Sequence, residues 1–267
     1  MKNPLKRIPD YFRGLEEKLF SVNDAIVEMK EAIADFNEIK KSVENLDESE
    51  RFRYSRRSYS QDGEDIVLAA FYESLPGYKG FYVDIGAFHP YRYSNTQYYY
   101  ERGWSGINID ALPGSMELFN RKRVHDINIE AGISEVGGVL QYYSFREPAL
   151  NSFNQEISEL RIREGWELLG KESIRTLNIN ELLKQYVPEG KKIDFMNLDV
   201  EGLDYVILQS LDWDLYRPDF LLVEALDIVD RDIMEYEETE EYNFLRERGY
   251  SVLARTRRTL IFGRGQL

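Results

Sequence analysis

The chain has 267 residues, of which 43% are hydrophobic and 13% aromatic, enough for one α/β domain with a sizeable core and an additional segment. A formal net charge of -14 argues against a general nucleic-acid-binding protein, and the lack of cysteine excludes disulfide frameworks and thiolate metal sites. No apolar run approaches the roughly 20 residues of a transmembrane segment, and the N-terminus has no apolar signal-peptide core, so we expect a cytoplasmic protein.

The first predicted element is a long amphipathic helix within residues 1–50. Its apolar residues recur at alternating steps of three and four, as in the heptad seam of a coiled coil, and the pattern slips after Phe36. This narrow stripe favours self-association, so we expect a homo-oligomer; the alternative is a helix that packs back onto its own domain. The seam consists of Phe12, Leu15, Leu19, Val22, Ile26, Met29, Ile33 and Phe36.

A short basic segment, residues 51–58, is expected to link this helix to a domain that spans residues 59–267. Its arginines suit a solvated linker, and the alternative is contact with an anionic substrate, such as a nucleotide sugar or a lipid-linked glycan phosphate. The domain opens with a helix predicted over residues 60–72, because polar and acidic residues at its start precede inward-facing apolar residues.

Residues 80–111 show the pattern of half a nucleotide-binding α/β unit. A β-branched and aromatic run at 81–85 predicts a buried strand. A helix over 95–102 and a second buried strand over 106–110 follow it. Asp110 ends the second strand, where its carboxylate is expected to accept both ribose hydroxyls of an adenosine.

The turn after the first of these strands indicates which nucleotide binds. A dinucleotide site needs the pattern Gly-x-Gly-x-x-Gly, so that a pyrophosphate can rest on a helix N-terminus. This turn has one glycine, Gly86, followed by Ala87, and no phosphate cradle. S-adenosylmethionine contains adenosine without phosphate and suits such a turn, in which glycine lets the ligand approach the backbone. Asp84 is then placed to receive the ammonium group of the cofactor, directly or through water.

The rest of the domain is predicted to complete the sheet. A third strand is expected over residues 126–133, and the segment from Gly132 to Ser134 is expected to touch the adenine. Residues 147–170 have weak periodicity, which favours either an acceptor-binding lid or a plain surface excursion. Further helices are predicted at 113–122, 178–186 and 203–211, and further strands at 141–145, 193–198, 220–223, 250–254 and 259–262, the last two as an antiparallel hairpin.

Acidic residues follow the predicted strands at the edge where ligands of open α/β sheets bind. A helix cap or a salt bridge would explain any one of these acids alone. Four acids at four strand ends favour a common site instead, and they are Asp84, Asp110, Asp199 and Glu224.

S-adenosylmethionine donates its methyl group to an acceptor. Where the acceptor is a hydroxyl, which is a poor nucleophile, a base helps by removing its proton. Three residues are candidates for this role. Asp199 and Glu201 are two positions apart, so in an extended backbone they share a face. They can then act as base and orienting group, or as oxygen ligands of Mg²⁺. His89 follows the first strand directly and is the third candidate, although a lone histidine before proline is often only a turn residue.

Several motifs, in order along the chain, resemble the FkbM family of S-adenosylmethionine-dependent methyltransferases. They are Tyr-Ser-Gln-Asp-Gly-Glu-Asp at 59–65, Asp-Ile-Gly-Ala-Phe-His-Pro at 84–90, Ser-Asn-Thr at 94–96 and Asp-Val-Glu-Gly at 199–202. The resemblance implies a Rossmann-like class I methyltransferase fold with a mostly parallel seven-stranded sheet, here preceded by the N-terminal coiled-coil helix. It also implies that the segment carrying Gln61 and Glu64 closes over the cofactor.

The activity that the resemblance implies is O-methylation, commonly of a sugar hydroxyl in a glycan, nucleotide sugar or natural product. Asp110 occupies the ribose position where many family members carry the longer but chemically equivalent Glu. Two alternatives stay open. One is a non-catalytic oligomeric scaffold that keeps the fold, and the other is a dinucleotide-dependent oxidoreductase, which the missing glycines disfavour.

Overall fold

The computed structural model describes residues 22, 26, 27, 29–38, 40, 41, 55–225, 229, 232 and 234–265. The chain divides into two units, Met1–Arg56 and Arg57–Leu267. In the first unit, the described residues between 22 and 41 are helical, and the apolar seam residues among them are exposed. The rest of the helix predicted within residues 1–50, and residues 51–54 of the predicted linker, lie outside the described residues. The coiled coil and the segment boundaries therefore stay predictions.

The second unit is built on a seven-stranded sheet with the order β3-β2-β1-β7-β8-β10-β9. Five strands are parallel: β1 (Phe81–Ile85), β2 (Ser105–Asp110), β3 (Ile127–Glu130), β7 (Phe195–Leu198) and β8 (Phe220–Glu224). The hairpin of β9 (Tyr250–Arg255) and β10 (Thr259–Arg264) is antiparallel, and β10 pairs with β8. The predicted mostly parallel sheet and its closing hairpin are confirmed.

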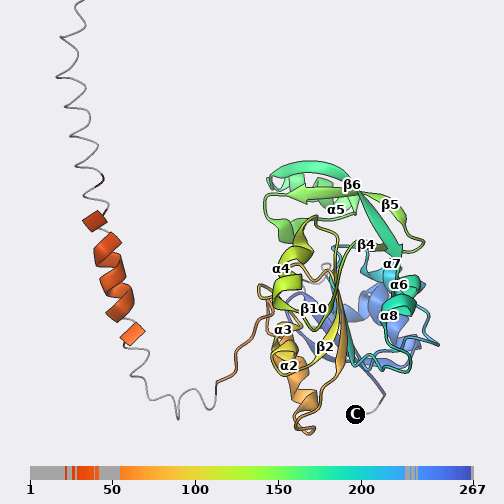
Figure 1. The fold of residues 1–267 in the computed structure, drawn as a ribbon. Helices are drawn as coiled ribbons and strands as arrows, with labels where there is room; N and C mark the ends of the chain where they lie inside the picture. The colour runs from red at the N-terminus through yellow and green to blue at the C-terminus, as the bar shows by residue number, and fades with distance from the viewer. Residues whose placement is uncertain are drawn as a thin grey trace, which may run out of the picture. The chain divides into compact units, whose positions relative to one another are not determined.

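Helices cover both faces of this sheet (Figure 1). One apolar cluster joins Tyr82 and Phe195 of the sheet to α2 and α3, and a second joins Val83 and Met196 to α6, α7 and α8. Neighbouring residues of one strand thus point to opposite apolar faces, as expected of parallel strands buried on both sides. The described helices around the large sheet are α2 (Glu64–Ala69, continued by η2, Ala70–Tyr72), α3 (Gln97–Tyr100), α4 (Ser115–Lys122), α6 (Ile179–Tyr186), α7 (Asp204–Ser210) and α8 (Glu240–Glu247, preceded by η5, Glu235–Glu238).

Among the helices that begin later than the sequence pattern predicted, two begin directly after a glycine. α2 begins at Glu64 rather than at residue 60, and α4 begins at Ser115 rather than at residue 113. Gly63 and Gly114 precede them with φ of 96° and 81°. Because a left-handed residue cannot continue a right-handed helix, each glycine sets the boundary. None of the described helices combines the length and the apolarity that crossing a membrane would need.

A second sheet is inserted between β3 and α6, and we call the whole insertion, residues 132–178, the cap. Its strands lie in the order β4 (Gly132–Ser134), β6 (Leu168–Asn178) and β5 (Gly138–Phe145), and it also contains η3 (Pro148–Leu150) and α5 (Gln155–Arg163). Figure 1 draws the cap in green at the top of this unit. The single strand predicted over 126–133 was wrong, because the chain leaves the large sheet after Glu130 and Gly132–Ser134 pairs with β6.

Candidate functional site

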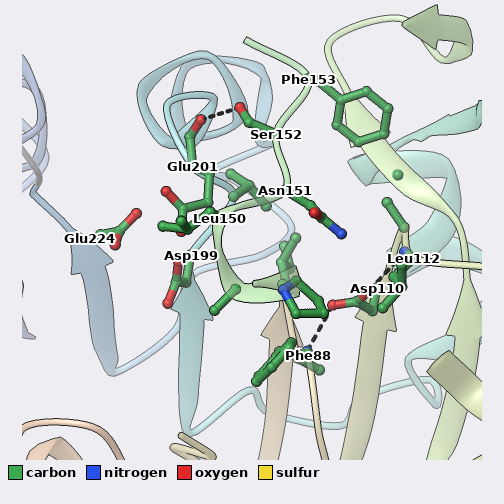
Figure 2. A pocket seen from close by; sticks show the side chains of 18 of the residues that line it. Phe88, Asp110, Leu112, Leu150, Asn151, Ser152, Phe153, Asp199, Glu201 and Glu224 are labelled. Atoms are coloured by element: carbon green, nitrogen blue, oxygen red, sulfur yellow. Dashed lines mark hydrogen bonds between the residues drawn. The ribbon is translucent and has the colours of Figure 1, made fainter. Parts of the chain in front are cut away.

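A cavity of about 320 Å³ lies between the cap and the carboxyl ends of the parallel strands (Figure 2). All four acids predicted to share a site, Asp84, Asp110, Asp199 and Glu224, line this cavity. Parallel strands end at the same edge of their sheet, so acids far apart in the sequence meet there.

The turn after β1 is fixed between its two neighbouring strands. Gly86 has φ of 85°, and a Cβ at this position would overlap the backbone carbonyl of Asp199. The N–H groups of Gly86 and Ala87 both donate to the carbonyl oxygen of Ile109, at 2.9 and 3.0 Å. Only glycine therefore allows this turn to lie so close to the end of β7.

Asp110 is held at the end of β2 by backbone hydrogen bonds. Its carboxylate accepts the N–H of Phe88 at 2.7 Å and that of Leu112 at 2.8 Å (Figure 2). Burial raises the pKa of Asp110 to about 6. Each carboxylate oxygen has a second lone pair, so the ionised group can still accept hydrogen bonds from hydroxyls in the cavity.

Asp84 lies deeper and already has two partners. Its carboxylate accepts hydrogen bonds from the hydroxyl of Thr96 and the side-chain amide of Asn197, both at 2.9 Å. Asn95 donates to the other side of the Asn197 amide at 2.9 Å. Burial raises the pKa of Asp84. No sequence pattern indicated Asn197, which also lines the cavity and which lies within an otherwise apolar strand.

A buried arginine holds the segment that carries Thr96. Arg123 is 0% exposed and donates to Ser94 Oγ at 3.0 Å, Thr96 Oγ1 at 3.3 Å and the carbonyl oxygen of Pro90 at 3.1 Å. No sequence pattern indicated Arg123 either, because its basic neighbours in the sequence suggest an exposed helix end.

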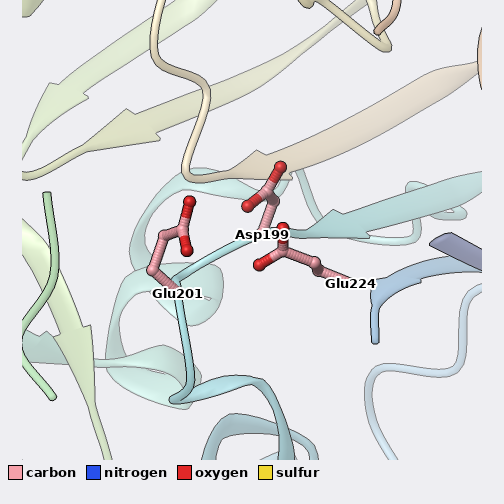
Figure 3. A group of neighbouring side chains, drawn as sticks. All are labelled: Asp199, Glu201 and Glu224. Carbon is pink, nitrogen blue, oxygen red and sulfur yellow. The ribbon is translucent and has the colours of Figure 1, made fainter. Parts of the chain in front are cut away.

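Three carboxylates converge at the ends of β7 and β8. Asp199, Glu201 and Glu224 each place one oxygen within 4.8 Å of the others (Figure 3). Burial raises the pKa of all three, and mutual repulsion raises those of Asp199 and Glu224 further. The sequence pattern predicted that Asp199 and Glu201 lie together, and the fold adds Glu224.

The cap contacts this acidic group through Glu201. Arg161 of α5 forms an ion pair with the Glu201 carboxylate and also donates to the carbonyl oxygen of Leu150 at 2.6 Å. The Ser152 hydroxyl donates to the Glu201 carbonyl oxygen at 2.8 Å. Glu201 has φ of 53°, an uncommon conformation for a residue with a side chain. The cap contacts thus help to hold it there.

Three predicted site residues lie apart from the cavity lining. His89 Nδ1 accepts hydrogen bonds from the backbone N–H groups of Tyr91 and Arg92 at 3.1 and 3.0 Å. Burial and the charge of Arg92 lower the pKa of His89. The hydrogen bonds support the interpretation of His89 as a turn residue. Glu64 accepts the hydroxyl of Thr256 at 2.5 Å, and Ser134 donates to Thr176 at 2.8 Å. The other predicted residues, among them Gln61, Gly132, Gly86 and Ala87, do line the cavity.

The family model described as the methyltransferase FkbM domain matches residues 84–252. Among solved structures, the chain is similar to fibrillarin from Aeropyrum pernix, crystallised with natively bound S-adenosyl-L-methionine, with 13% identity, a TM-score of 0.38 and coverage of 78% of this chain and 82% of that one. The comparison with curated proteins gave no match. Because the family model covers more than half of its length, the chain belongs to the FkbM methyltransferase family.

Proposed function

We propose that this methyltransferase transfers a methyl group from S-adenosylmethionine to a hydroxyl oxygen of a sugar, in a glycan, nucleotide sugar or natural product. The observation that carries the proposal is the cavity at the strand ends, in which Asp110 is presented by two backbone N–H groups. An acid at this place suits ribose hydroxyls, and the turn beside it has no phosphate cradle.

The residues around the cavity fit the proposed cofactor. Asp110 would accept the ribose hydroxyls, and the lining residues Leu112, Gly132 and Phe153 offer an apolar surface for the adenine beyond it. Gln61 and Arg258 line the cavity as well and carry donors that suit the carboxylate of the methionine part.

When bound, S-adenosylmethionine supplies a methyl carbon on a positively charged sulfur, so the acceptor oxygen bonds to that carbon while the C–S bond breaks and its electron pair stays on sulfur. The chain must hold the acceptor oxygen in line with the C–S bond, and it must take up the proton of the acceptor hydroxyl. Asp199 is the proposed base, because burial beside other acids raises its pKa well above the usual range and makes it a better proton acceptor. Glu201, held by Arg161, would orient the hydroxyl.

Aromatic rings support a sugar as the acceptor. Phe88, Tyr93 and Trp166 all line the cavity, and Tyr93 and Trp166 are 40% and 48% exposed, which places them on its open side. The apolar face of a sugar ring can pack on such rings, while its hydroxyls reach the acids. Tyr93 comes from the turn after β1 and Trp166 from the cap, so the acceptor would lie between the two segments.

The N-terminal helix supports self-association as a second part of the proposal. Five described residues of the first unit, Val22, Ile26, Met29, Ile33 and Phe36, are helical and belong to the heptad seam. Apolar side chains at heptad spacing are ordinarily buried against a second helix. A second copy of the same chain offers a matching seam.

Calorimetry and a transfer assay test the proposal. We expect S-adenosylhomocysteine to bind the full-length protein, and NAD not to bind. Incubation with S-adenosylmethionine and glycans from the source cells should add the mass of one methyl group to an acceptor. Binding of S-adenosylhomocysteine without transfer to any of these acceptors would favour the scaffold, and binding of NAD alone would favour the oxidoreductase.

A further inference from the structure

Three acidic side chains from different segments face one another on one side of the cavity. Asp199 follows β7, Glu201 lies in the turn beyond it, and Glu224 ends β8. Their carboxyl groups point into the same space in Figure 3, with one oxygen of each within 4.8 Å of the others. Among the described residues, this is the group of acids whose spacing would suit a metal ion.

Glu224 shares a side-chain hydrogen bond with Asp199, but within the described part of the chain one of its two oxygens still lacks a partner. The residue is 9% exposed, and its Oε2 atom is buried with no hydrogen-bond partner among the residues that the structure describes. Buried side-chain oxygens are nearly always paired, so an orphan calls for an explanation. Figure 3 shows the Glu224 carboxyl group beside those of Asp199 and Glu201, so a cation between the three acids would give this carboxyl group a partner.

The nearby cations do not balance these acids. Arg161 forms an ion pair with Glu201, and Arg258 forms one with Asp62 at 2.9 Å. Within the described part of the chain, neither Asp199 nor Glu224 has a salt bridge. Buried carboxylates without a compensating positive charge are strongly unfavourable, and either a shared proton or a bound cation would relieve them.

We infer that Asp199, Glu201 and Glu224 together bind one divalent cation of the Mg²⁺ or Mn²⁺ class. The group offers carboxylate oxygens alone, which hard cations prefer, and it has no imidazole or thiolate to favour zinc. At metal–oxygen distances of about 2.1 Å in an octahedron, neighbouring ligand oxygens lie about 3 Å apart. The three carboxylates therefore need only close inward by side-chain rotation. The cavity beside them leaves room for water or an acceptor oxygen to complete the coordination.

The role of this cation, unlike its binding, rests on the proposed function. A cation beside the acceptor hydroxyl would make its proton more acidic and fix the position of its oxygen. Arg161 would then share Glu201 with the metal, which links the cap to the cation site.

Electron paramagnetic resonance of Mn²⁺ tests the inference without relying on turnover. Titrated into the full-length protein, Mn²⁺ should lose its free-ion signal at about one ion per chain, and added Mg²⁺ should restore it. Glu224→Gln should weaken Mn²⁺ binding by more than about tenfold, since even residues that only position a metal ligand are worth 10–100-fold. Asp110→Asn, a matched change in the same cavity but outside the three acids, should bind Mn²⁺ as the wild type does.

Urea denaturation shows that each variant is folded, and calorimetry with S-adenosylhomocysteine on the wild type and Glu224→Gln separates this inference from the proposed function. No Mn²⁺ binding by wild-type protein that binds S-adenosylhomocysteine would overturn the metal site and leave the methyltransferase proposal intact. Unchanged Mn²⁺ affinity in Glu224→Gln, or equal loss in Asp110→Asn, would also overturn it. If S-adenosylhomocysteine displaces Mn²⁺, the acids serve the cofactor ammonium and the inference fails.

Discussion

Replacing Asp110 by asparagine removes one negative charge from the cavity while keeping the size of the side chain. In the wild type the carboxylate accepts the N–H groups of Phe88 and Leu112 at 2.7 and 2.8 Å, and its remaining lone pairs face the proposed ribose site. The amide would lose the charge-assisted hydrogen bonds to two ribose hydroxyls, worth about 2–4 kcal/mol together. We therefore expect S-adenosylhomocysteine to bind about 30- to 900-fold more weakly.

The pH dependence gives this prediction a second readout. The pKa of Asp110 is raised by burial from 3.8 to about 6, so wild-type affinity should increase as the pH rises through 6 and the carboxylate ionises. The contribution of Asp110 to the free energy of unfolding has the opposite trend. It is fully present below 3.8 and is lost as the pH rises through about 6, by about 3 kcal/mol in total. Both trends should be missing from Asp110→Asn.

Calorimetry with S-adenosylhomocysteine between pH 5 and 8, paired with urea denaturation, measures both quantities. Glu130→Gln is the matched control, because Glu130 pairs with Asp110 in register at the end of β3 but lies outside the cavity lining. Its affinity should equal that of the wild type. A folded Asp110→Asn protein that binds S-adenosylhomocysteine with wild-type affinity would refute the assignment of Asp110 to the ribose.

Three further predictions concern the acids, the cap and the N-terminal helix. Asp199→Asn and Glu201→Gln should each lower single-turnover methyl transfer by about 10²–10⁴-fold while changing S-adenosylhomocysteine affinity far less; equal losses in both would assign these acids to cofactor binding. Gly202→Ala should lower the free energy of unfolding in urea by about 1–3 kcal/mol, because φ is 95° and a Cβ would overlap Ile157 of the cap; an unchanged value would contradict this packing. Deleting residues 1–50 should give fewer chains per particle by light scattering and keep S-adenosylhomocysteine binding, whereas an unchanged number would end the proposal of self-association.

The central parallel strands β1, β2, β7 and β8 could be predicted because they are buried on both faces. The predicted strand at 81–85 coincides with β1, and all five of its residues are buried. β6 of the cap gave no such signal. Most of its residues are exposed or half-buried, and it carries Lys171, Glu172 and Arg175. Hydrophobic periodicity reports burial, so a strand with little burial leaves a weak pattern.

The candidate site could be predicted where it depends on a local pattern. Asp110 and Gly86 follow strands and were found in this way. The hydrogen bond between Asp84 and Asn197 spans 113 residues, and the ion pair between Arg161 and Glu201 spans 40. No spacing rule in the sequence brings such pairs together.

Polar contacts join the cap to the turn after β7, so a change in the cap can reach the acids beside the proposed acceptor site. Ser152 donates to the Glu201 carbonyl, Arg161 pairs with the Glu201 carboxylate, and Asn154 donates to the Gly202 carbonyl at 3.5 Å. Glu201 has φ of 53°, a conformation that persists only where its surroundings fix it. The same cap also supplies Trp166 to the proposed acceptor site. A change in the cap that alters the proposed acceptor contacts should therefore also move Glu201, one of the proposed catalytic acids, unless Ser152 and Arg161 keep their places.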